Sequence, residues 1–310
     1  MAISKMMRAV LKALSYPDID VKKNYSIERV FVNATNYSIK KSSYITWDHV
    51  ITSGDHTIPV RIFLSSKKGP HAVLLFFHGG GWVTGNIDSY NDVCATLAEK
   101  TNHTVISVDY CLAPEHRFPA AFEDCYRVAR ELFLKPSLFN VSADQITVIG
   151  DSAGGNLAAA VSLAARDRGE FLPARQILLY PATYNNHSES SPFPSVRENG
   201  TDYLLTSKRI SDYMDLYMAD ESDLQNPYFA PLMATDFSHQ PKTLIITAQF
   251  DPLRDEGEAY GEKLKEGGTA VEVHRISDSL HGFFSLPFFF PQVKESYQVI
   301  NHFLSEEKQP

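Results

Sequence analysis

The sequence has few cysteines and no excess of basic residues, and each shortage excludes a class of protein. Its three cysteines, Cys94, Cys111 and Cys125, form no C-x-x-C pair and have no zinc-like spacing. They therefore favour buried apolar thiols in a reducing compartment over a disulfide framework or a metal site. Asp and Glu outnumber Lys and Arg by 37 to 29, a formal net charge of −8. This balance argues against a general nucleic-acid or anionic-membrane binder.

Long apolar runs are also missing, so we expect no membrane span, which needs about 18 consecutive apolar residues. The most apolar segment, Phe283 to Phe290, is short and interrupted. The N-terminal segment carries basic residues in its first turns but no uninterrupted apolar region with a cleavage site, so it is a poor signal peptide. We expect a soluble, cytoplasmic protein. At 310 residues, the chain is long enough to bury a full core without a metal or a disulfide.

The hydrophobic period changes along the chain. Residues 3–14 have helical spacing, and a loosely patterned stretch follows to about residue 43. Residues 44–53 and 57–65 alternate around Gly54-Asp55, which predicts a hairpin. Six short, nearly continuous apolar runs then follow, at 72–77, 104–109, 145–149, 176–180, 242–247 and 270–275. Helical patterns separate them at 90–100, 120–133, 156–168 and 255–266. This alternation predicts an α/β fold with about eight strands, mostly parallel, and helices on both faces.

One connection, from residue 181 to 241, is too long for a compact α/β unit. We therefore expect an insertion with its own structure, helical around 207–218, which forms a lid over a site. The lid is rich in aromatic residues, which fit either an apolar pocket or ordinary lid packing: Tyr184, Phe193, Tyr203, Tyr213 and Tyr217.

The sharpest motif is Gly150-Asp-Ser-Ala-Gly154, a G-x-S-x-G sequence between a predicted buried strand and a predicted helix. In this setting the serine occupies a strained tight turn that lifts its hydroxyl above the sheet, and larger flanking residues would collide with the strand and helix. Ser152 is therefore the candidate nucleophile.

A second motif, His78-Gly-Gly-Gly-Trp82, directly follows the run at 72–77. Three successive glycines cost conformational entropy, and packing alone does not account for them. They are expected where backbone N–H groups must closely approach a ligand, such as a developing oxyanion.

The base and its orienting acid should follow the nucleophile in the order Ser, acid, His. His281 stands in a loop just past the last run, where an imidazole can reach a hydroxyl, and Asp251 ends the run before it. Asp255 is the rival acid, a helical turn further on. The other histidines after Ser152 lie in less suitable places: His187, His239, His274 and His302.

These motifs together resemble the hormone-sensitive lipase family of α/β-hydrolases, in its bacterial-type carboxylesterases. The similarity runs over most of residues 45–305 and rests on motifs that match in order: His78-Gly-Gly-Gly-Trp82, Tyr110-Cys-Leu-Ala-Pro-Glu-His-Arg-Phe-Pro-Ala120, Gly150-Asp-Ser-Ala-Gly-Gly155, Asp251-Pro-Leu-Arg-Asp-Glu-Gly257 and His281-Gly-Phe283. One departure is Cys111, where the family usually has Arg. This puts in doubt any ion pair made by that arginine, but not the triad.

The resemblance implies an α/β-hydrolase fold with a helical cap. It implies a nucleophile, base and acid at Ser152, His281 and Asp251. It also implies oxyanion N–H groups from Gly80, Gly81 and Ala153. The cap would comprise residues 1–43 and 185–225, and the catalytic core residues 44–184 and 226–310. Dimerisation through the last strand and helix is a further expectation of the family.

The predicted function is serine carboxylesterase activity on short-chain acyl esters, with no metal and no organic cofactor. The partner would be a small-molecule ester, and no nucleic acid. Two alternatives stay open at this point: an amide or peptide hydrolase, and a ligand receptor on the same fold that does not turn over its ligand. The presence of His281 argues against the receptor, because such receptors lack the histidine.

Overall fold

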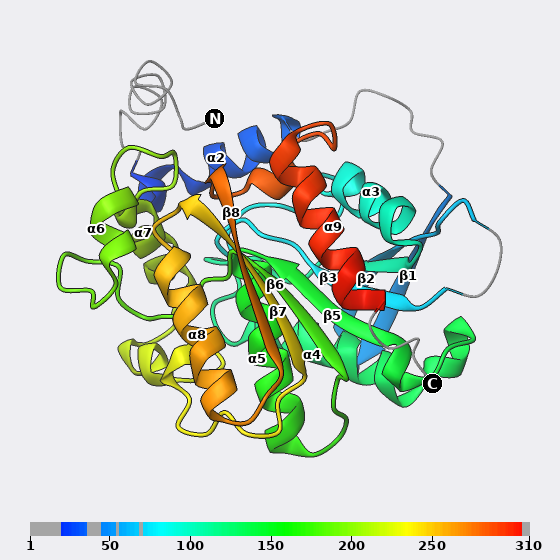
Figure 1. Cartoon of the computed structure of the whole chain (residues 1–310). Helices are drawn as coiled ribbons and strands as arrows, with labels where there is room; N and C mark the ends of the chain where they lie inside the picture. Colours follow the sequence, from blue (N-terminus) through cyan, green and yellow to red (C-terminus); the bar gives the residue numbers. More distant parts are fainter. Residues whose placement is uncertain (1–19, 36–44, 54–55, 68–70, 306–310) are drawn as a thin grey trace.

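The computed structural model describes residues 20–35, 45–53, 56–67 and 71–305. The helix predicted at 3–14 lies outside the described residues. A single eight-stranded sheet crosses the described part, in the order β1-β2-β4-β3-β5-β6-β7-β8 (Figure 1). The fold prediction is therefore confirmed.

The strands follow the predicted runs closely. They are β1 (Thr46–Ser53), β2 (His56–Phe63), β3 (Val73–Phe77), β4 (Thr104–Val108), β5 (Ile146–Asp151), β6 (Arg175–Leu179), β7 (Lys242–Phe250) and β8 (Val271–Leu280). The β1–β2 and β2–β4 pairs are antiparallel, and all other neighbours are parallel. Every residue of β3, β4, β5 and β6 is buried, because helices cover both faces of these central strands.

Two hydrophobic cores lie on opposite faces of the sheet. On one face, α3 (Asn91–Thr101) and α9 (Pro291–Ser305) bury residues such as Leu97 and Tyr297. Helices α3 and α9 lie beside each other in Figure 1. The other face is covered by α4 (Ala120–Leu134), α5 (Ala153–Arg168) and α8 (Arg254–Glu266), with Leu132, Ala158 and Tyr260 in the core.

The long connection after β6 has its own structure, as predicted. It contains α6 (Pro194–Asn199), α7 (Ser207–Tyr217) and short 3₁₀ turns at Glu221–Gln225 and Pro231–Met233. In Figure 1, α7 lies toward the end of the sheet to which the β7 arrow points. The insertion therefore covers the carboxyl ends of the strands, where ligands bind in open α/β sheets.

One helix was not predicted. Residues Val21–Thr35 form α2, whereas the sequence indicated only a loosely patterned stretch to about residue 43. The apolar stripe is weak because Ile27, Val30 and Phe31 are exposed rather than turned to a core. Helix α2 packs on α7 through Glu28, which accepts hydrogen bonds from Arg209 and Tyr213. An N-terminal segment thus contacts the insertion.

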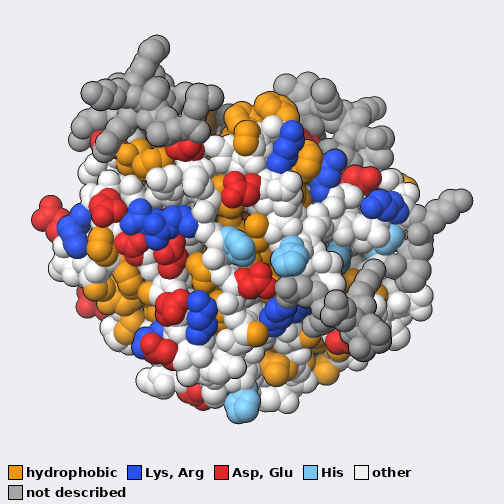
Figure 2. Space-filling view, in the orientation of Figure 1, with side chains coloured by type: hydrophobic (Ala, Val, Ile, Leu, Met, Phe, Trp, Pro, Cys, Tyr) orange, Lys and Arg blue, Asp and Glu red, His pale blue; other side chains and the backbone are white. Residues whose placement is uncertain are grey.

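Acidic and basic side chains are interspersed on the face shown in Figure 2, with no broad basic patch there. Among the described residues, no helix combines the length and the apolar character needed to cross a bilayer.

Candidate active site

Ser152 stands alone between β5 and α5, in a conformation that L-residues rarely adopt, with φ +55° and ψ −119°. The flanking glycines make this turn sterically feasible. A Cβ on Gly150 would lie 2.2 Å from the Gly154 carbonyl oxygen, and a Cβ on Gly154 would lie 2.0 Å from the Phe77 carbonyl oxygen. The backbone itself therefore requires glycine at both positions, and the tight turn presents the serine hydroxyl to the cavity.

A chain of hydrogen bonds links the three side chains that the sequence singled out. His281 Nε2 lies 2.8 Å from Ser152 Oγ, and His281 Nδ1 lies 2.7 Å from Asp251 Oδ2. The ring of Tyr180 meets the imidazole edge-on, with centroids 4.9 Å apart. The structure thus brings together residues up to 129 positions apart in the arrangement in which a carboxylate orients an imidazole toward a hydroxyl.

The acid is held on several sides. Asp251 is fully buried, and its Oδ1 accepts a hydrogen bond of 2.8 Å from the N–H of Leu253. Helix α6 fixes the same turn, because Asn199 Nδ2 donates to the Asp251 carbonyl and Ser195 Oγ donates to the Pro252 carbonyl. The insertion after β6 therefore supports the position of Asp251.

The rival residues have other partners. Asp255 accepts hydrogen bonds from the Ser195 N–H and from Arg254 at the start of α8. The remaining histidines lie elsewhere: His187 is buried against Glu256, His274 is 3.6 Å from Glu272, His302 is in the last turn of α9, and His239 precedes β7. The hydroxyl of Ser152 hydrogen-bonds to His281 alone among the described residues.

The glycine motif after β3 wraps beside the serine. Gly80 and Gly81 have φ of +119° and +59°, and a Cβ on Gly81 would lie 2.5 Å from the Tyr213 ring. Among the described residues, the Gly80 and Gly81 N–H groups have no hydrogen-bond acceptor. The Ala153 N–H is the first of α5 and has none within the helix. All three residues line the cavity at Ser152, so their N–H groups can meet an anionic oxygen there.

Sequence reasoning missed Asp151, which anchors this motif. Its carboxylate accepts hydrogen bonds from the Gly79 N–H at 2.9 Å, the Tyr90 hydroxyl at 3.0 Å and the Tyr180 hydroxyl at 3.4 Å. Burial raises the pKa of Asp151 to about 6, and these hydrogen bonds oppose the rise. The only signal in the sequence is its place beside Ser152, where a charged residue is unexpected at the end of a buried strand.

The cavity at Ser152 has a volume of about 320 Å³. Its walls are mainly apolar. Leu253, just before α8, contributes one wall residue, and others come from α2, α7 and the loop before α7: Val32, Leu205, Ile210 and Tyr213. Glu28 and Arg209 close it on the cap side. A small, mostly apolar cavity with one polar end is suited to a small ester.

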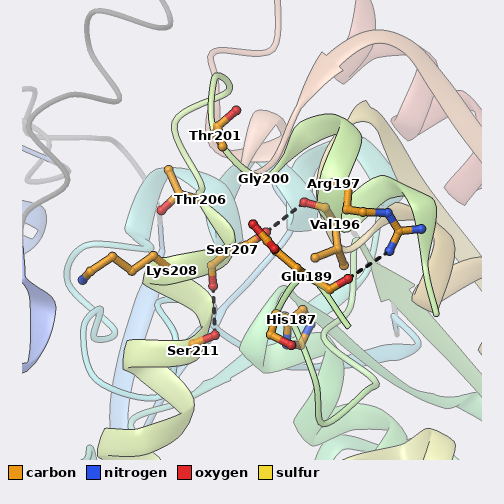
Figure 3. Close-up of a pocket in the computed structure, with 11 residues that line it drawn as sticks. His187, Glu189, Val196, Arg197, Gly200, Thr201, Thr206, Ser207, Lys208 and Ser211 are labelled. Carbon is orange, nitrogen blue, oxygen red and sulfur yellow. Dashed lines mark hydrogen bonds between the residues drawn. The ribbon is translucent and has the colours of Figure 1, made fainter. Parts of the chain in front are cut away.

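A larger cavity of about 840 Å³ lies within the insertion, lined by His187 and by residues of α6 and α7. Figure 3 shows hydrogen bonds among the residues that line it, such as Ser207 to the Val196 carbonyl and Ser211 to the Ser207 carbonyl. Ser152 and His281 do not line it. The larger of the two cavities is therefore not the one that holds the candidate catalytic residues.

The aromatic residues of the insertion serve mainly as packing. Of these five, only Tyr213 lines the cavity at Ser152. Tyr184 and Phe193 meet edge-to-face, whereas Tyr203 stacks on Phe250 and Tyr217 on Trp82.

The Phe283–Phe290 segment divides between core and surface. Phe283 and Phe284 are buried against Tyr180 and Tyr297, while Phe289 is 68% exposed.

Cys111 is not placed as a nucleophile. Its nearest histidine is His56, with Sγ 4.0 Å from Nε2. Burial, together with the neighbouring Asp124, raises the pKa of the Cys111 thiol to about 12. The thiol is therefore neutral at physiological pH.

Comparisons with known proteins show the family to which the chain belongs. The α/β hydrolase fold family matches residues 74–285. An arylesterase of Saccharolobus solfataricus is 37% identical over 243 residues, which cover 78% of each chain. An ethyl acetate hydrolase of Pseudomonas putida is 35% identical, over 75% of this chain and 73% of that protein. The crystal structure of a hyperthermophilic esterase from Pyrobaculum calidifontis superposes with a TM-score of 0.84 at 33% identity and covers 99% of each chain. This chain therefore belongs to the hormone-sensitive lipase family of α/β-hydrolases.

Proposed function

We propose that the chain is a serine carboxylesterase that hydrolyses short-chain acyl esters through an acyl-enzyme intermediate. The observation that carries this proposal is the hydrogen-bonded series Asp251–His281–Ser152 beside the unpaired N–H groups of the glycine motif. The arylesterase and the ethyl acetate hydrolase among its relatives support ester hydrolysis, and the cavity of about 320 Å³ supports a small substrate.

In the first step, His281 Nε2 takes the proton of Ser152 while Oγ attacks the ester carbonyl. The negative charge that develops on the carbonyl oxygen is stabilised by the N–H groups of Gly80, Gly81 and Ala153. Each such donor typically lowers the activation barrier by about 3–4 kcal/mol. Asp251 keeps the proton on His281 Nδ1 and stabilises the imidazolium that forms.

The imidazolium then protonates the leaving alkoxide, and the alcohol departs. Water enters, loses a proton to His281, and attacks the acyl-enzyme through a second tetrahedral intermediate. Ser152 regains its proton when that intermediate collapses and the carboxylic acid leaves. None of these steps calls on a metal or an organic cofactor.

The division of the chain follows from the same proposal. Residues 1–43 and 185–225 would form the cap, and residues 44–184 and 226–310 the catalytic core. The contact between α2 and α7 supports the pairing of the two cap segments. The three unpaired cysteines support a cytoplasmic location. Dimerisation through the last strand and helix stays a prediction, which light scattering of the purified protein can test.

The decisive experiment measures p-nitrophenol release from esters with acyl chains from acetyl to decanoyl. Ser152→Ala should abolish release, and an organophosphate should add covalently to Ser152 in the intact protein, as seen by mass spectrometry. Asp251→Asn should lower kcat on the order of 10⁴-fold, because the imidazole then takes the wrong tautomer. Asp255→Asn is the matched control, since this acid does not touch His281, and kcat should stay within about tenfold of wild type.

Three outcomes would contradict the proposal. Near-normal esterase activity in Ser152→Ala would remove the nucleophile. Binding of esters without any turnover would favour the receptor alternative, and preferential cleavage of the matched anilides would favour an amide hydrolase.

A further inference from the structure

Three metal-ligating side chains of different kinds converge at a place away from the triad. His56 begins β2, Cys111 follows β4, and Asp124 lies in α4. Their donor atoms all lie within 4.8 Å of one another. The His56 Nε2 is 2.9 Å from Asp124 Oδ1 and 4.0 Å from Cys111 Sγ. The cluster includes the cysteine that replaces the usual arginine of the family.

The cluster is not arranged as a second catalytic triad. In such a triad, the acid and the nucleophile face opposite nitrogens of the imidazole, as they do at His281. Here the carboxylate and the thiol both face Nε2 of His56. That nitrogen carries either one proton or one lone pair and cannot relay a proton between the two groups. Three donor atoms of metal-binding types within 4.8 Å of one another are instead the arrangement of a cation site.

Two of the three donor separations are close to those around a tetrahedral zinc ion, and the third, between the sulfur and the carboxylate oxygen, is within 4.8 Å. Zinc binds sulfur at about 2.3 Å and nitrogen or carboxylate oxygen at about 2.0 Å, with angles near the tetrahedral value. These bond lengths place the sulfur about 3.5 Å from the nitrogen, and the nitrogen about 3.3 Å from the oxygen. The observed separations of 4.0 and 2.9 Å differ from those edges by about half an ångström or less, which small side-chain rotations can supply.

We propose that His56, Cys111 and Asp124 bind one Zn²⁺ ion. A thiolate and an imidazole favour zinc over the hard cations Mg²⁺ and Ca²⁺, which prefer oxygen ligands. On binding, the thiol proton leaves to solvent and the imidazole keeps its proton on Nδ1, so that Nε2 offers a lone pair. Water completes the fourth position. The ion can enter from solvent because the His56 side chain is 41% exposed.

The carboxylate is already oriented for this role. Asp124 Oδ2 accepts a hydrogen bond of 3.0 Å from the Cys111 N–H, which leaves Oδ1 directed at His56. The Asp124 side chain is only 5% exposed, so its position is fixed by packing. A hydrogen bond of this kind to a ligating carboxylate is a common support of metal sites.

The site would be structural. Zinc would join the start of β2, the segment after β4 and α4. Cys111 is adjacent to Tyr110, whose ring stacks on His78 with centroids 4.2 Å apart and whose hydroxyl donates to the His78 carbonyl. The ion would thus stiffen the segment that supports the glycine motif without touching the reacting atoms. Cysteine spacing gives no sign of the site, because its ligands lie 55 and 13 residues from Cys111.

Metal binding to the full-length protein tests this inference. Protein freed of metal by dialysis against a chelator is titrated with ZnCl₂, and in parallel with CoCl₂ as a spectroscopic probe. We expect one zinc per chain, a thiolate-to-cobalt charge-transfer band, and a rise of a few degrees in Tm when zinc is in about hundredfold excess over its Kd. Ester hydrolysis by the wild-type protein should be the same with and without chelator.

Variants identify the ligands. Cys111→Ser should abolish the charge-transfer band. Both Cys111→Ser and His56→Gln should weaken zinc binding at least tenfold, because loss of a residue that only hydrogen-bonds to a metal ligand already costs about tenfold or more. His49→Gln, on the neighbouring strand of the same hairpin and exposed, is the matched control and should bind zinc as wild type does.

Three results would overturn the inference. The first is a wild-type protein that shows no cobalt–thiolate band, and the second is unchanged zinc affinity in both ligand variants. The third is loss of esterase activity on chelation, which would refute the structural role. Loss of activity in Ser152→Ala alone has no bearing on the metal site, so the two proposals fail independently.

Discussion

Replacing Asp151 by Asn should change how the stability of the protein depends on pH. Burial raises the pKa of this carboxyl from 3.8 to about 6, despite hydrogen bonds from Gly79, Tyr90 and Tyr180. The folded protein therefore takes up a proton at Asp151 more readily than the unfolded chain does. Its contribution to stability is full below pH 3.8 and is lost as the pH rises through about 6.

The magnitude follows from the two pKa values. A gap between 3.8 and about 6 corresponds to about 3 kcal/mol in the free energy of unfolding. Roughly 2 kcal/mol of this loss falls between about pH 4.5 and about pH 8, where the protein can be handled. Asn has the same shape, accepts the Gly79 N–H through its amide oxygen, and has no charge to desolvate.

Urea unfolding of wild type and Asp151→Asn across this range measures the effect. The stability of the variant relative to wild type should rise by about 2 kcal/mol from the acidic to the alkaline end. The comparison between the two proteins cancels the titrating groups that do not interact with Asp151; His281 is one that does interact with it. A difference that stays constant with pH would show that the Asp151 carboxyl ionises normally, and would refute the argument from burial.

The other predictions concern backbone space, the acid turn and the cap. Gly150→Ala should abolish folding or activity, because its Cβ would lie 2.2 Å from a backbone oxygen. Gly257→Ala in α8, where a Cβ would have no neighbour nearer than 3.4 Å, should leave folding and activity intact. Thermal unfolding and esterase assays distinguish the two variants. Asn199→Ala should lower kcat about three- to tenfold with little change in KM, since one buried hydrogen bond to the Asp251 turn is lost. Steady-state kinetics in which both kcat and KM equal the wild-type values would count against a positioning role. Glu28→Gln should raise KM several-fold at nearly constant kcat, because it weakens the link between α2 and α7 over the cavity; a variant that lost kcat alone would disagree.

Much of the fold follows from local patterns in the sequence. The central strands are buried on both faces, so they are short continuous apolar runs that only a covered parallel sheet accommodates. Helix α2 escaped prediction because three of its apolar side chains, Ile27, Val30 and Phe31, are exposed and obscure the apolar stripe. Its place is set by Glu28, which bonds across 181 and 185 residues to α7, a contact that no local window contains.

The residues of the candidate site likewise divide into those that the sequence can predict and those that it cannot. His281 could be selected because chain order and a loop after the last strand restrict the choice. Asp151 could not, because its role depends on Tyr90 and Tyr180, which reach it from distant segments. The function of Cys111 likewise depends on His56 and Asp124, which the fold alone brings to it.

The contact between Gly154 and the Phe77 carbonyl has a consequence for how this enzyme can change. The turn that carries Ser152 rests on the end of β3, and the chain continues from that end directly into the glycine motif. The same piece of main chain therefore positions both the attacking oxygen and the anion-stabilising amides, while Val32 and Tyr213 belong to the outer helices α2 and α7. Evolution can remodel those outer walls to admit new acyl or alcohol groups and leave the reactive distances untouched.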